Sequence, residues 1–351
     1  MNNMRNRFSF FSIIPPHMLD QIARNGTKAQ RAWALDTLAI DHTVRSVRLA
    51  GISVTQALGD GTPGQVQRTI YSAKNTTNLP GAVVRTEGQG KTSDVEINEA
   101  YDYLGATYEL YWNAYHRNSI DDAGMPLYGI VHYGKKYDNA FWDGAEMVFG
   151  DGDGKLFNRF TIASDVVGHE LTHGVTEHEA NLAYFNQAGA LNESVSDVFG
   201  SLVKQRLLKQ TANTADWLIG AGLFAKGVKG TALRSMAAPG SAYDDPVLGK
   251  DPQPSSMKDY VHTTQDNGGV HINSGIPNHA FYLAATTIGG KAWEKSGRIW
   301  YDTICDPRLK TNAGFSAFAK RTIANANHLY GPKAKETRAV HDAWTAVGVT
   351  I

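Results

Sequence analysis

The sequence contains almost no cysteine and no excess of either charge. Cys305 is the single cysteine among 351 residues, so no intrachain disulfide can form. Lys and Arg number 34, Asp and Glu also number 34, and the pI is about 7.2. Proteins that bind nucleic acid or anionic membranes through charge need a basic surface, which this composition does not supply. We therefore expect neither partner.

Long apolar runs are also missing. No stretch approaches the roughly eighteen apolar residues that a membrane helix requires. A basic start followed by the apolar residues 8–14 imitates a signal peptide, but this run is short and leads into Pro15 and Pro16 without a small-residue cleavage site. We expect no recognisable signal peptide. The length of 351 residues is sufficient for two packed domains.

The most informative segment is the short motif from His169 to His173, which reads His-Glu-Leu-Thr-His. On a helix, residues four apart lie one above the other, so one metal ion can bind both histidines. A zinc ion that acts on a substrate needs three protein ligands and one open position. Glu170 would lie beside that ion without binding it. The motif therefore predicts a catalytic zinc site and requires one more ligand.

The segment from Asn192 to Asp197 offers that ligand. Apolar residues around it recur at spacings of three and four, which predicts a second amphipathic helix with Glu193 and Asp197 on its other side. These apolar residues are Leu191, Val195, Val198, Phe199 and Leu202. Packed against the first helix, Glu193 can bind zinc and Asp197 can accept the free ring N–H of a ligand histidine. A solvated acidic helix face is the alternative.

Strand-like segments precede the metal motif and helical segments follow it. Strands are expected at 68–72, 82–85, 127–133 and 147–150. Helices are expected from the capping segment 92–94 to Tyr115, and at 191–209, 277–288, 291–303, 314–328 and 333–347. This order predicts an α+β fold in which the zinc helix joins a sheet-rich lobe to a mainly helical lobe. A substrate site is expected between the lobes.

A glycine-rich segment from Gln265 to Gly275 carries Asp266 and His271, five residues apart. Together with the two helical motifs, in this order, it resembles the thermolysin family of zinc endopeptidases. Smaller matches extend the resemblance over about residues 68 to 350. They are Asn139-Ala140-Phe141-Trp142, Asp151-Gly152-Asp153-Gly154, Tyr184 nine before Glu193, and Leu233-Arg234-Ser235-Met236.

The resemblance implies a role for each matching residue. His169, His173 and Glu193 would bind one catalytic zinc ion, with Asp197 and Asn192 supporting these ligands. Glu170 would take a proton from a zinc-bound water and deliver it to the leaving amine. His271 and Tyr184 would donate hydrogen bonds to the oxyanion, and Asp266 would orient His271. A histidine in an ordinary turn is the alternative for His271 on its own.

Substrate contacts are implied in the same way. Asn139 and Ala140 would lie on an edge strand that pairs with an extended peptide, and Arg234 would bind a carbonyl beyond the cleaved bond. A pocket there would be lined by Phe157, Phe160, Val166, Ile219 and Leu233. Its apolar character predicts cleavage before a bulky hydrophobic residue, whereas ordinary core packing is the alternative for these five.

One departure concerns calcium. The family often builds a double calcium site from carboxylates, but this chain has Lys204, Leu218 and Ala221 at such positions and keeps only Asp165 and Asp216. Calcium needs several carboxylate oxygens, and an ammonium group there replaces its charge. We therefore predict no double calcium site and a pairing of Lys204 with Asp216. The segment 151–154 is expected to be a tight turn.

The first fifty residues have a different character. Their Pro-Pro-His-Met-Leu element at 15–19 resembles the protealysin-type branch of the family, which has a short propeptide. Trp33, Thr37, Ile40, Val44 and Val47 form a helical stripe that could pack on another surface. We expect residues 1–50 to be a propeptide, 51–184 an N-terminal catalytic lobe with the zinc helix, and 185–351 a helical catalytic lobe. An N-terminal extension that caps an apolar patch is the alternative.

These observations predict a zinc-dependent neutral endopeptidase that is made as an autoinhibited precursor and removes its own propeptide. We expect a monomer that acts on peptide or protein substrates, with its propeptide as an intramolecular inhibitor. Action outside the cell is expected by a route without a recognisable signal peptide, with the precursor accumulating in the cytoplasm. The alternative is a catalytically silent, peptidase-like zinc protein that serves for binding.

Overall fold

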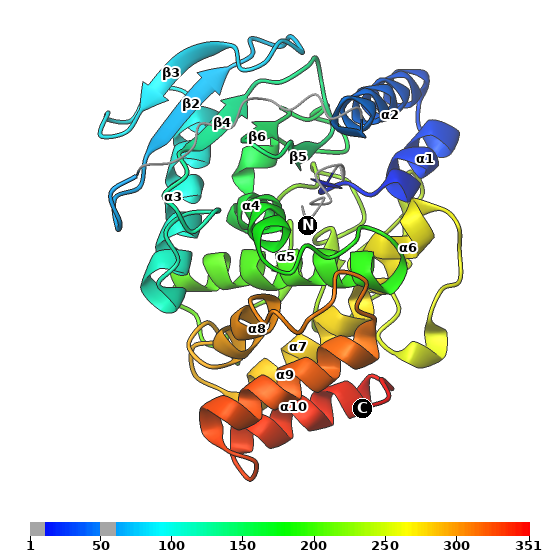
Figure 1. Cartoon of the computed structure of the whole chain (residues 1–351). Coiled ribbons are helices and arrows are strands. Elements are labelled where there is room, and N and C mark those ends of the chain that lie inside the picture. Colours follow the sequence, from blue (N-terminus) through cyan, green and yellow to red (C-terminus); the bar gives the residue numbers. More distant parts are fainter. Residues whose placement is uncertain (1–10, 50–60) are drawn as a thin grey trace.

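The computed structural model of the protein describes residues 11–49 and 61–351. In Figure 1 a sheet-rich lobe lies above a helical lobe, and the helices α4 (Ser164–His178) and α5 (Asn186–Leu207) run between them. Two N-terminal helices, α1 (Pro16–Asn25) and α2 (Lys28–Leu49), lie beside the sheet lobe. The predicted α+β arrangement is thus present, with sheet before and helices after the metal helix.

The main sheet has six strands in the order β1-β5-β6-β4-β2-β3. Their bounds are β1 (Phe11–Ser12), β2 (Arg68–Ser72), β3 (Ala82–Thr86), β4 (Leu127–Val131), β5 (Ala140–Trp142) and β6 (Glu146–Phe149). The pairs β2/β4 and β4/β6 are parallel, while β1/β5, β5/β6 and β2/β3 are antiparallel. The four strands expected from the sequence all form, and the N-terminal strand β1 was not expected.

Helix α3 (Val95–Tyr115) covers the sheet and starts where its capping residue predicts. The Asp94 carboxylate accepts hydrogen bonds from the backbone N–H groups of Glu96 and Ile97, which satisfies donors that no helical carbonyl can reach. The apolar face of this helix is buried, including Ile97 and Tyr111. Local capping and periodicity therefore account for this element.

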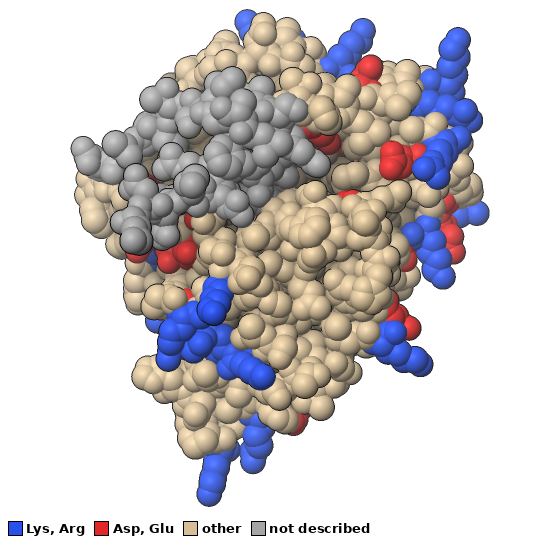
Figure 2. Space-filling model, turned by 45° about the vertical axis from the view of Figure 1, so that its right-hand side comes forward, with Lys and Arg blue, Asp and Glu red and all other residues tan. Residues whose placement is uncertain are grey.

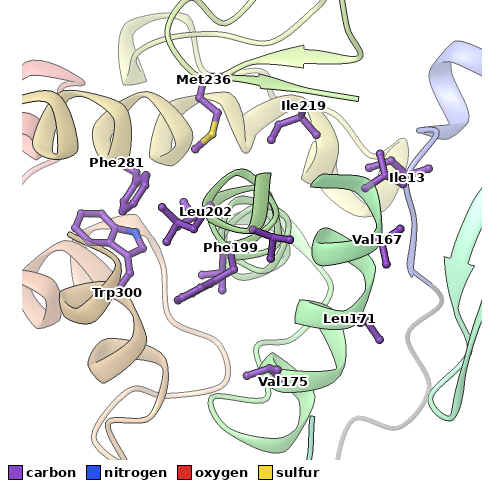
Figure 3. Packing of buried hydrophobic residues seen from close by; sticks show 14 of the residues in the cluster. Ile13, Val167, Leu171, Val175, Phe199, Leu202, Ile219, Met236, Phe281 and Trp300 are labelled. Atoms are coloured by element: carbon purple, nitrogen blue, oxygen red, sulfur yellow. The ribbon is translucent and has the colours of Figure 1, made fainter. Parts of the chain in front are cut away.

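Helices α4 and α5 touch through glycine. A Cβ atom on Gly200 would lie 2.3 Å from the carbonyl oxygen of Asp165, and one on Gly168 would lie 3.0 Å from the Cα atom of Gly200. The absence of side chains at this crossing lets the two helix backbones approach closely. Figure 3 shows Leu171 of α4 and Phe199 of α5 in the apolar packing that continues on both sides. This close contact brings the polar faces of the two helices within bonding distance.

The helical lobe contains the segments that close the site. Its helices are α6 (Asp266–Asn273), α7 (Gly275–Ile288), α8 (Ser296–Ile304), α9 (Phe315–Tyr330) and α10 (Lys335–Ala346). Two small antiparallel sheets pair β7 (Leu218–Ile219) with β8 (Arg234–Ser235) and β9 (Asp244–Asp245) with β10 (Gly249–Lys250). Two 3-10 turns, η1 (Phe160–Ile162) and η2 (Met257–Asp259), complete the described elements. The helix expected at 291–303 begins later, at Ser296, because residues 292–295 form a turn.

The N-terminal helices dock on the sheet lobe as the apolar stripe predicts. Ile40 and Val44 of α2 pack against a small buried cluster that contains Tyr137 and Phe141. The Thr37 hydroxyl accepts a hydrogen bond of 3.3 Å from the backbone N–H of Asp138. The expected boundary at residues 50 and 51 and the side chain of Val47 lie outside the described residues.

Within residues 11–49 and 61–351, no helix combines the length and apolar character needed to cross a membrane. On the face drawn in Figure 2, Lys and Arg side chains form separate groups around the rim of a mostly uncharged surface. A single basic patch is therefore not seen on this face among the described residues, in keeping with zero net charge.

Candidate active site

His169, His173 and Glu193 meet at the crossing of α4 and α5. Their donor atoms all lie within 4.8 Å of one another, and all three side chains are buried. The two Nε2 atoms are 3.0 Å apart, and each lies 3.5 Å from an oxygen of Glu193. Three ligand atoms of these types at one point form a set that could hold a zinc ion.

Hydrogen bonds behind the histidines determine which nitrogen faces the cluster. The Nδ1 atom of His169 lies 2.8 Å from the Asp197 carboxylate, and that of His173 lies 2.7 Å from the Asn192 side-chain oxygen. Both partners are acceptors, so each Nδ1 carries the proton and each Nε2 presents a lone pair. Two lone pairs and a carboxylate directed at one point are the donor set of a cation. The chemistry of the cluster therefore fits zinc.

Asp197 is bound from several sides. Arg234 donates two hydrogen bonds to it, of 2.8 and 2.7 Å, and Asn278 donates another of 2.8 Å. Burial opposes ionisation of Asp197, but the charge of Arg234 and the hydrogen bond from His169 hold its pKa below the usual range. Asp197 is therefore an anion that holds His169 in place. Asn278 was not anticipated, because it belongs to none of the motifs.

Glu170 lies between the cluster and the edge strand. One of its carboxylate oxygens accepts a 3.1 Å hydrogen bond from the backbone N–H of Trp142 in β5, and the other has no hydrogen-bond partner among the described residues. Burial and the charge of Glu193 raise the pKa of Glu170 well above its usual range. A carboxylate with a raised pKa and one open oxygen suits proton transfer.

His271, Tyr184 and Asp266 form a second polar group beside Glu193. The Tyr184 hydroxyl donates to Glu193 and lies 3.2 Å from Nε2 of His271, whose Nδ1 lies 2.6 Å from Asp266. Burial opposes a charge on His271, but Asp266 and Glu193 outweigh it and raise its pKa to about 9. His271 therefore carries a proton on Nε2 at neutral pH and can donate it to an oxygen.

The backbone around Asp266 explains the glycines of this segment. Asp266, Asn267, Gly268 and Gly269 all have φ values between 51° and 85°, a left-handed conformation that favours glycine. This turn directs the Asp266 carboxylate back onto His271, where it also accepts a 2.9 Å hydrogen bond from the backbone N–H of that residue. This turn thus holds the imidazole of His271 in place through Asp266.

The N-terminal strand β1 lies along the edge strand of this site. The backbone N–H of Ile13 donates to the Ala140 carbonyl at 3.1 Å, and that of Ile14 donates to the Asn139 side chain at 3.0 Å. Arg234 donates to the carbonyl of Ile13 at 3.3 Å. The three residues predicted to contact substrate are therefore brought together, and a segment of the same chain engages all of them.

The apolar residues predicted to line a pocket belong to the same core as Ile13. Phe157, Phe160, Val166, Ile219 and Leu233 are all buried and belong to the same apolar cluster as Ile13. Figure 3 places Ile13 at the Val167 end of α4, with Ile219 nearby. Ile13 has no exposed surface. Its side chain fills apolar space beside the metal helix.

Two family models match this chain. The model of the thermolysin metallopeptidase catalytic domain matches residues 47–177, and that of the thermolysin metallopeptidase alpha-helical domain matches residues 180–349. The chain belongs to the thermolysin metallopeptidase family. It is therefore a metalloprotease with a thermolysin-like fold, and its family uses a catalytic zinc.

Whole-chain relatives agree with this membership. An extracellular metalloprotease of Pectobacterium carotovorum subsp. carotovorum is 55% identical over 340 residues, which cover 97% of this chain and 96% of the relative. Protease PrtS of Photorhabdus sp. (strain Az29) is 49% identical over 98% of this chain and 93% of its own length. A solved structure, the precursor of protealysin, a metalloproteinase from Serratia proteamaculans, matches with a TM-score of 0.89 at 59% identity, over 97% of this chain and 100% of that chain.

Lys204 lies between the carboxylates of Asp165 and Asp216. Its ammonium lies 2.9 Å from Asp165 and 2.8 Å from Asp216, and it donates to the carbonyl of Leu218. The expected pairing with Asp216 is present, and the second pairing ties the start of α4 to the end of α5. The side chains of Lys204 and Asp165 are largely buried.

Two other groups of residues lie outside the site. The Asp153 carboxylate accepts hydrogen bonds from the backbone N–H groups of Lys155, Leu156 and Phe157, so the segment 151–154 is part of a tight turn as expected. The partly exposed His132 lies between the carboxylates of Asp94 and Asp151, at 2.9 and 3.1 Å.

Proposed function

We propose that this metalloprotease is the precursor of a zinc-dependent endopeptidase that acts outside the cell, cuts before bulky hydrophobic residues and is inhibited by its own residues 1–50. One observation carries the proposal. The strand at Phe11–Ser12 and the two residues after it use the edge strand, Asn139, Arg234 and His271 as a peptide substrate would. The site is thus shaped for an extended peptide, and a segment of the chain covers it.

The proposed chemistry assigns one task to each group. A zinc ion held by His169, His173 and Glu193 would make a bound water nucleophilic and polarise the scissile carbonyl. Glu170 accepts the proton of the attacking water through its open oxygen and transfers it to the leaving nitrogen. His271 and Tyr184, both protonated at neutral pH, donate hydrogen bonds to the developing oxyanion. Burial and the charge of Glu193 raise the pKa of Tyr184, which keeps its hydroxyl a donor.

The proposed preference for a hydrophobic residue follows from the lining of the pocket. Transfer of a charged side chain into an apolar site without a partner is strongly unfavourable, whereas an aliphatic or aromatic side chain gains free energy by leaving water. Ile13, the residue that fills this space, is itself aliphatic. A cleavage profile dominated by acidic or basic residues after the cut would contradict this part of the proposal.

The proposed inhibition depends on the contacts of α2 as well as on β1. Asp41 of α2 accepts a hydrogen bond of 2.9 Å from the side-chain amide of Asn139 and another of 2.5 Å from the Tyr137 hydroxyl. Asn139 therefore has its amide held by α2 and its oxygen held by Ile14. A peptide substrate cannot use Asn139 while both contacts persist, so the prosegment competes directly with substrate.

Two further parts of the proposal concern the metal content and the location of the enzyme. We propose one zinc ion per monomer and no double calcium site, because Lys204 already supplies a positive charge between Asp165 and Asp216. We propose that the enzyme acts outside the cell after release without a recognisable signal peptide, with the precursor accumulating in the cytoplasm. A relative named as an extracellular metalloprotease supports the extracellular part. Peptides or proteins are the proposed substrates, without nucleic-acid or membrane partners.

The substitution Glu170→Ala tests the proposed chemistry. It should leave zinc bound, because Glu170 is not among the donor atoms, and it should lower peptide hydrolysis by about 10²–10⁴-fold, the usual contribution of a general base. Zinc per chain is measured by elemental analysis, and hydrolysis with casein and a synthetic peptide after removal of the prosegment.

A matched control is Glu294→Ala, which removes an exposed carboxylate paired with Lys291 and should retain full activity. Unchanged hydrolysis in Glu170→Ala would show that another group takes the proton. A wild-type enzyme that binds zinc and hydrolyses no peptide would instead support the alternative of a catalytically silent binding protein.

A further inference from the structure

The N-terminal segment lies in the site in one direction, which can be compared with the direction of a substrate. Each site residue has a proposed position along a substrate: His271 at the carbonyl of the bond to be cut, Arg234 and Asn139 beyond it. His271 Nε2 lies 3.3 Å from the carbonyl oxygen of Ser12, and Arg234 lies 3.3 Å from that of Ile13. The segment therefore runs in the direction of a substrate.

The register of the segment identifies one peptide bond. The carbonyl at His271 belongs to Ser12, and the next N–H, that of Ile13, donates to the Ala140 carbonyl at 3.1 Å. Phe11 pairs with Trp142 and Ser12 with Phe141 in the antiparallel ladder, which excludes a shift of the strand by one residue. The bond at the reacting position is thus Ser12–Ile13.

The side chain after this bond also fits a substrate. Ile13 is aliphatic, has no exposed surface and packs in the apolar cluster that contains the proposed specificity pocket. Ser12, Ile13 and Ile14 are all buried, so no outside protease can reach the bond while the segment is docked. Among the described residues, the catalytic group His271 of the same chain lies against the Ser12 carbonyl.

We infer that the Ser12–Ile13 bond is the first bond cut in the precursor, within one molecule, before the prosegment is released. This inference rests on the proposed endopeptidase function. Water adds its oxygen to the Ser12 carbonyl carbon, the bond from that carbon to the Ile13 nitrogen breaks, and Glu170 passes the proton of the water to that nitrogen. The products are a carboxylate on Ser12 and an amine on Ile13, with no change in oxidation state.

This first cut does not by itself activate the enzyme. Residues after Ile13 remain tied to the catalytic lobe by contacts that the cut leaves intact. Met18, Leu19 and Ile22 of α1 are buried, and Asp41 of α2 still binds Asn139. The product that begins at Ile13 therefore stays docked as an inhibited intermediate until a second cut frees the prosegment.

A time course of N-terminal sequences tests the inference. Metal-free wild-type precursor is mixed with zinc sulfate, and the chains are identified by intact-mass spectrometry while peptide hydrolysis is followed in parallel. A species that begins at Ile13 should appear before any chain lacking the whole prosegment and before hydrolysis rises. A chain that loses the whole prosegment without an Ile13 intermediate would overturn the inference.

Two variants sharpen the test. Ile13→Asp places a carboxylate in an apolar site and should slow this cut by at least about 100-fold, whereas Ile13→Leu keeps an aliphatic side chain and should be cut at nearly the wild-type rate. The melting temperature of each variant, measured in the Glu170→Ala background, shows whether the precursor still folds. Equal cutting rates of the Asp and Leu variants, with both folded, would contradict the assignment.

The intramolecular claim has its own test. Glu170→Ala precursor mixed with mature wild-type enzyme should yield no species that begins at Ile13, because its bond lies in its own inactive site. Formation of that species at the rate seen in wild-type precursor would overturn the claim. If the mature enzyme hydrolyses peptides but no Ile13 terminus forms, the inference falls and the proposed function stands. If it hydrolyses none, the proposed function falls first.

Discussion

Two polar clusters lie where α4 and α5 meet, and they differ in the source of their positive charge. One cluster contains Asp165, Lys204 and Asp216, so its positive charge is part of the chain. The other contains His169, His173 and Glu193, which present only lone pairs to one another. Asp165 and His169 are one helical turn apart on α4.

This difference shows how one packed interface can have two chemical uses. An ammonium between two carboxylates is satisfied internally and serves the contact between the helices. Lone pairs directed at one point require a cation from solution, and a divalent ion that accepts them can keep a position open for water. Stability is therefore expected to depend on the first cluster and metal-dependent activity on the second.

The largest expected effect comes from removing the internal cation. Lys204→Met retains much of the apolar stem but leaves the buried Asp165 carboxylate without its partner, which should lower the free energy of unfolding by about 3–5 kcal/mol. Urea unfolding of the Glu170→Ala precursor measures this change without self-digestion. The exposed pair partner Lys291 provides the control, since Lys291→Met should change stability by less than about 0.5 kcal/mol.

A smaller effect is expected from removing a hydrogen bond behind the metal ligands. Asn192→Ala removes the acceptor behind His173 and should weaken zinc binding by about 10–100-fold. Competition with a chelator of known affinity gives the zinc constant, and urea unfolding without zinc gives the stability. The exposed Asn113→Ala on α3 should alter neither. Equal zinc affinities of Asn192→Ala and wild type would show that this hydrogen bond does not hold the ligand.

We expect calcium to bind between Asp165 and Asp216 only after Lys204 is replaced by a carboxylate. Calcium up to about 10 mM should leave the melting temperature of the wild-type chain unchanged. Lys204→Glu places three carboxylates together, and for a weak site calcium at that concentration should then add about 1–3 kcal/mol of stability. Calorimetry with and without calcium makes the comparison. A marked rise in the wild-type melting temperature would contradict the predicted absence of the double calcium site.

A third cluster consists of His132, Asp94, Glu96 and Asp151. Its cation, His132, is titratable, so the comparison can be tested by changing the pH. The hydrogen bond to Asp151 raises the pKa of His132 to about 9, with Asp94 adding to it and burial opposing it. Burial and the charge of Asp151 likewise raise the pKa of the neighbouring Glu96, to about 8.

The sign of this pH dependence follows from proton binding. Both groups hold their protons more tightly in the folded chain, so stability is greatest at low pH within this range and falls as pH rises. The contribution of His132 is complete below about pH 6.5 and is lost through pH 9. His132→Gln in the Glu170→Ala precursor should show a smaller fall in unfolding free energy between pH 6.5 and 9.5. The exposed His341→Gln should follow the unsubstituted curve, and identical slopes for all three chains would refute the role of His132.

Several features of the molecule follow from local sequence alone. The spacing of His169 and His173 on a helix, the cap at Asp94 and the turn at Asp153 each depend on residues within one or two turns of chain. Resemblance then supplied the expectation that Glu193, His271 and Arg234 meet. The structure brings these groups together, although none of the quoted motifs contains the partner Asn278.

The path of the N-terminal segment could not be predicted from the sequence. The strand β1 in this segment has only two residues, Phe11–Ser12, and its partner β5 is more than a hundred residues further along the chain. Residues 12–14 contribute backbone groups to the described hydrogen bonds that hold them, and backbone groups carry no residue-specific signal. The substrate-like direction and register could therefore be seen only in three dimensions.

The sequence by itself determined which helix faces carry metal ligands, because helical periodicity is a property of the local backbone that residue spacing reveals directly. The resemblance to the family added that a lysine stands where carboxylates would be needed for calcium. Only the tertiary structure decided that Lys204 bonds to both Asp165 and Asp216, and that Ser12–Ile13 lies at the reacting position. These arrangements depend on packing between distant segments, and their free energies are shared among many contacts that no short motif records.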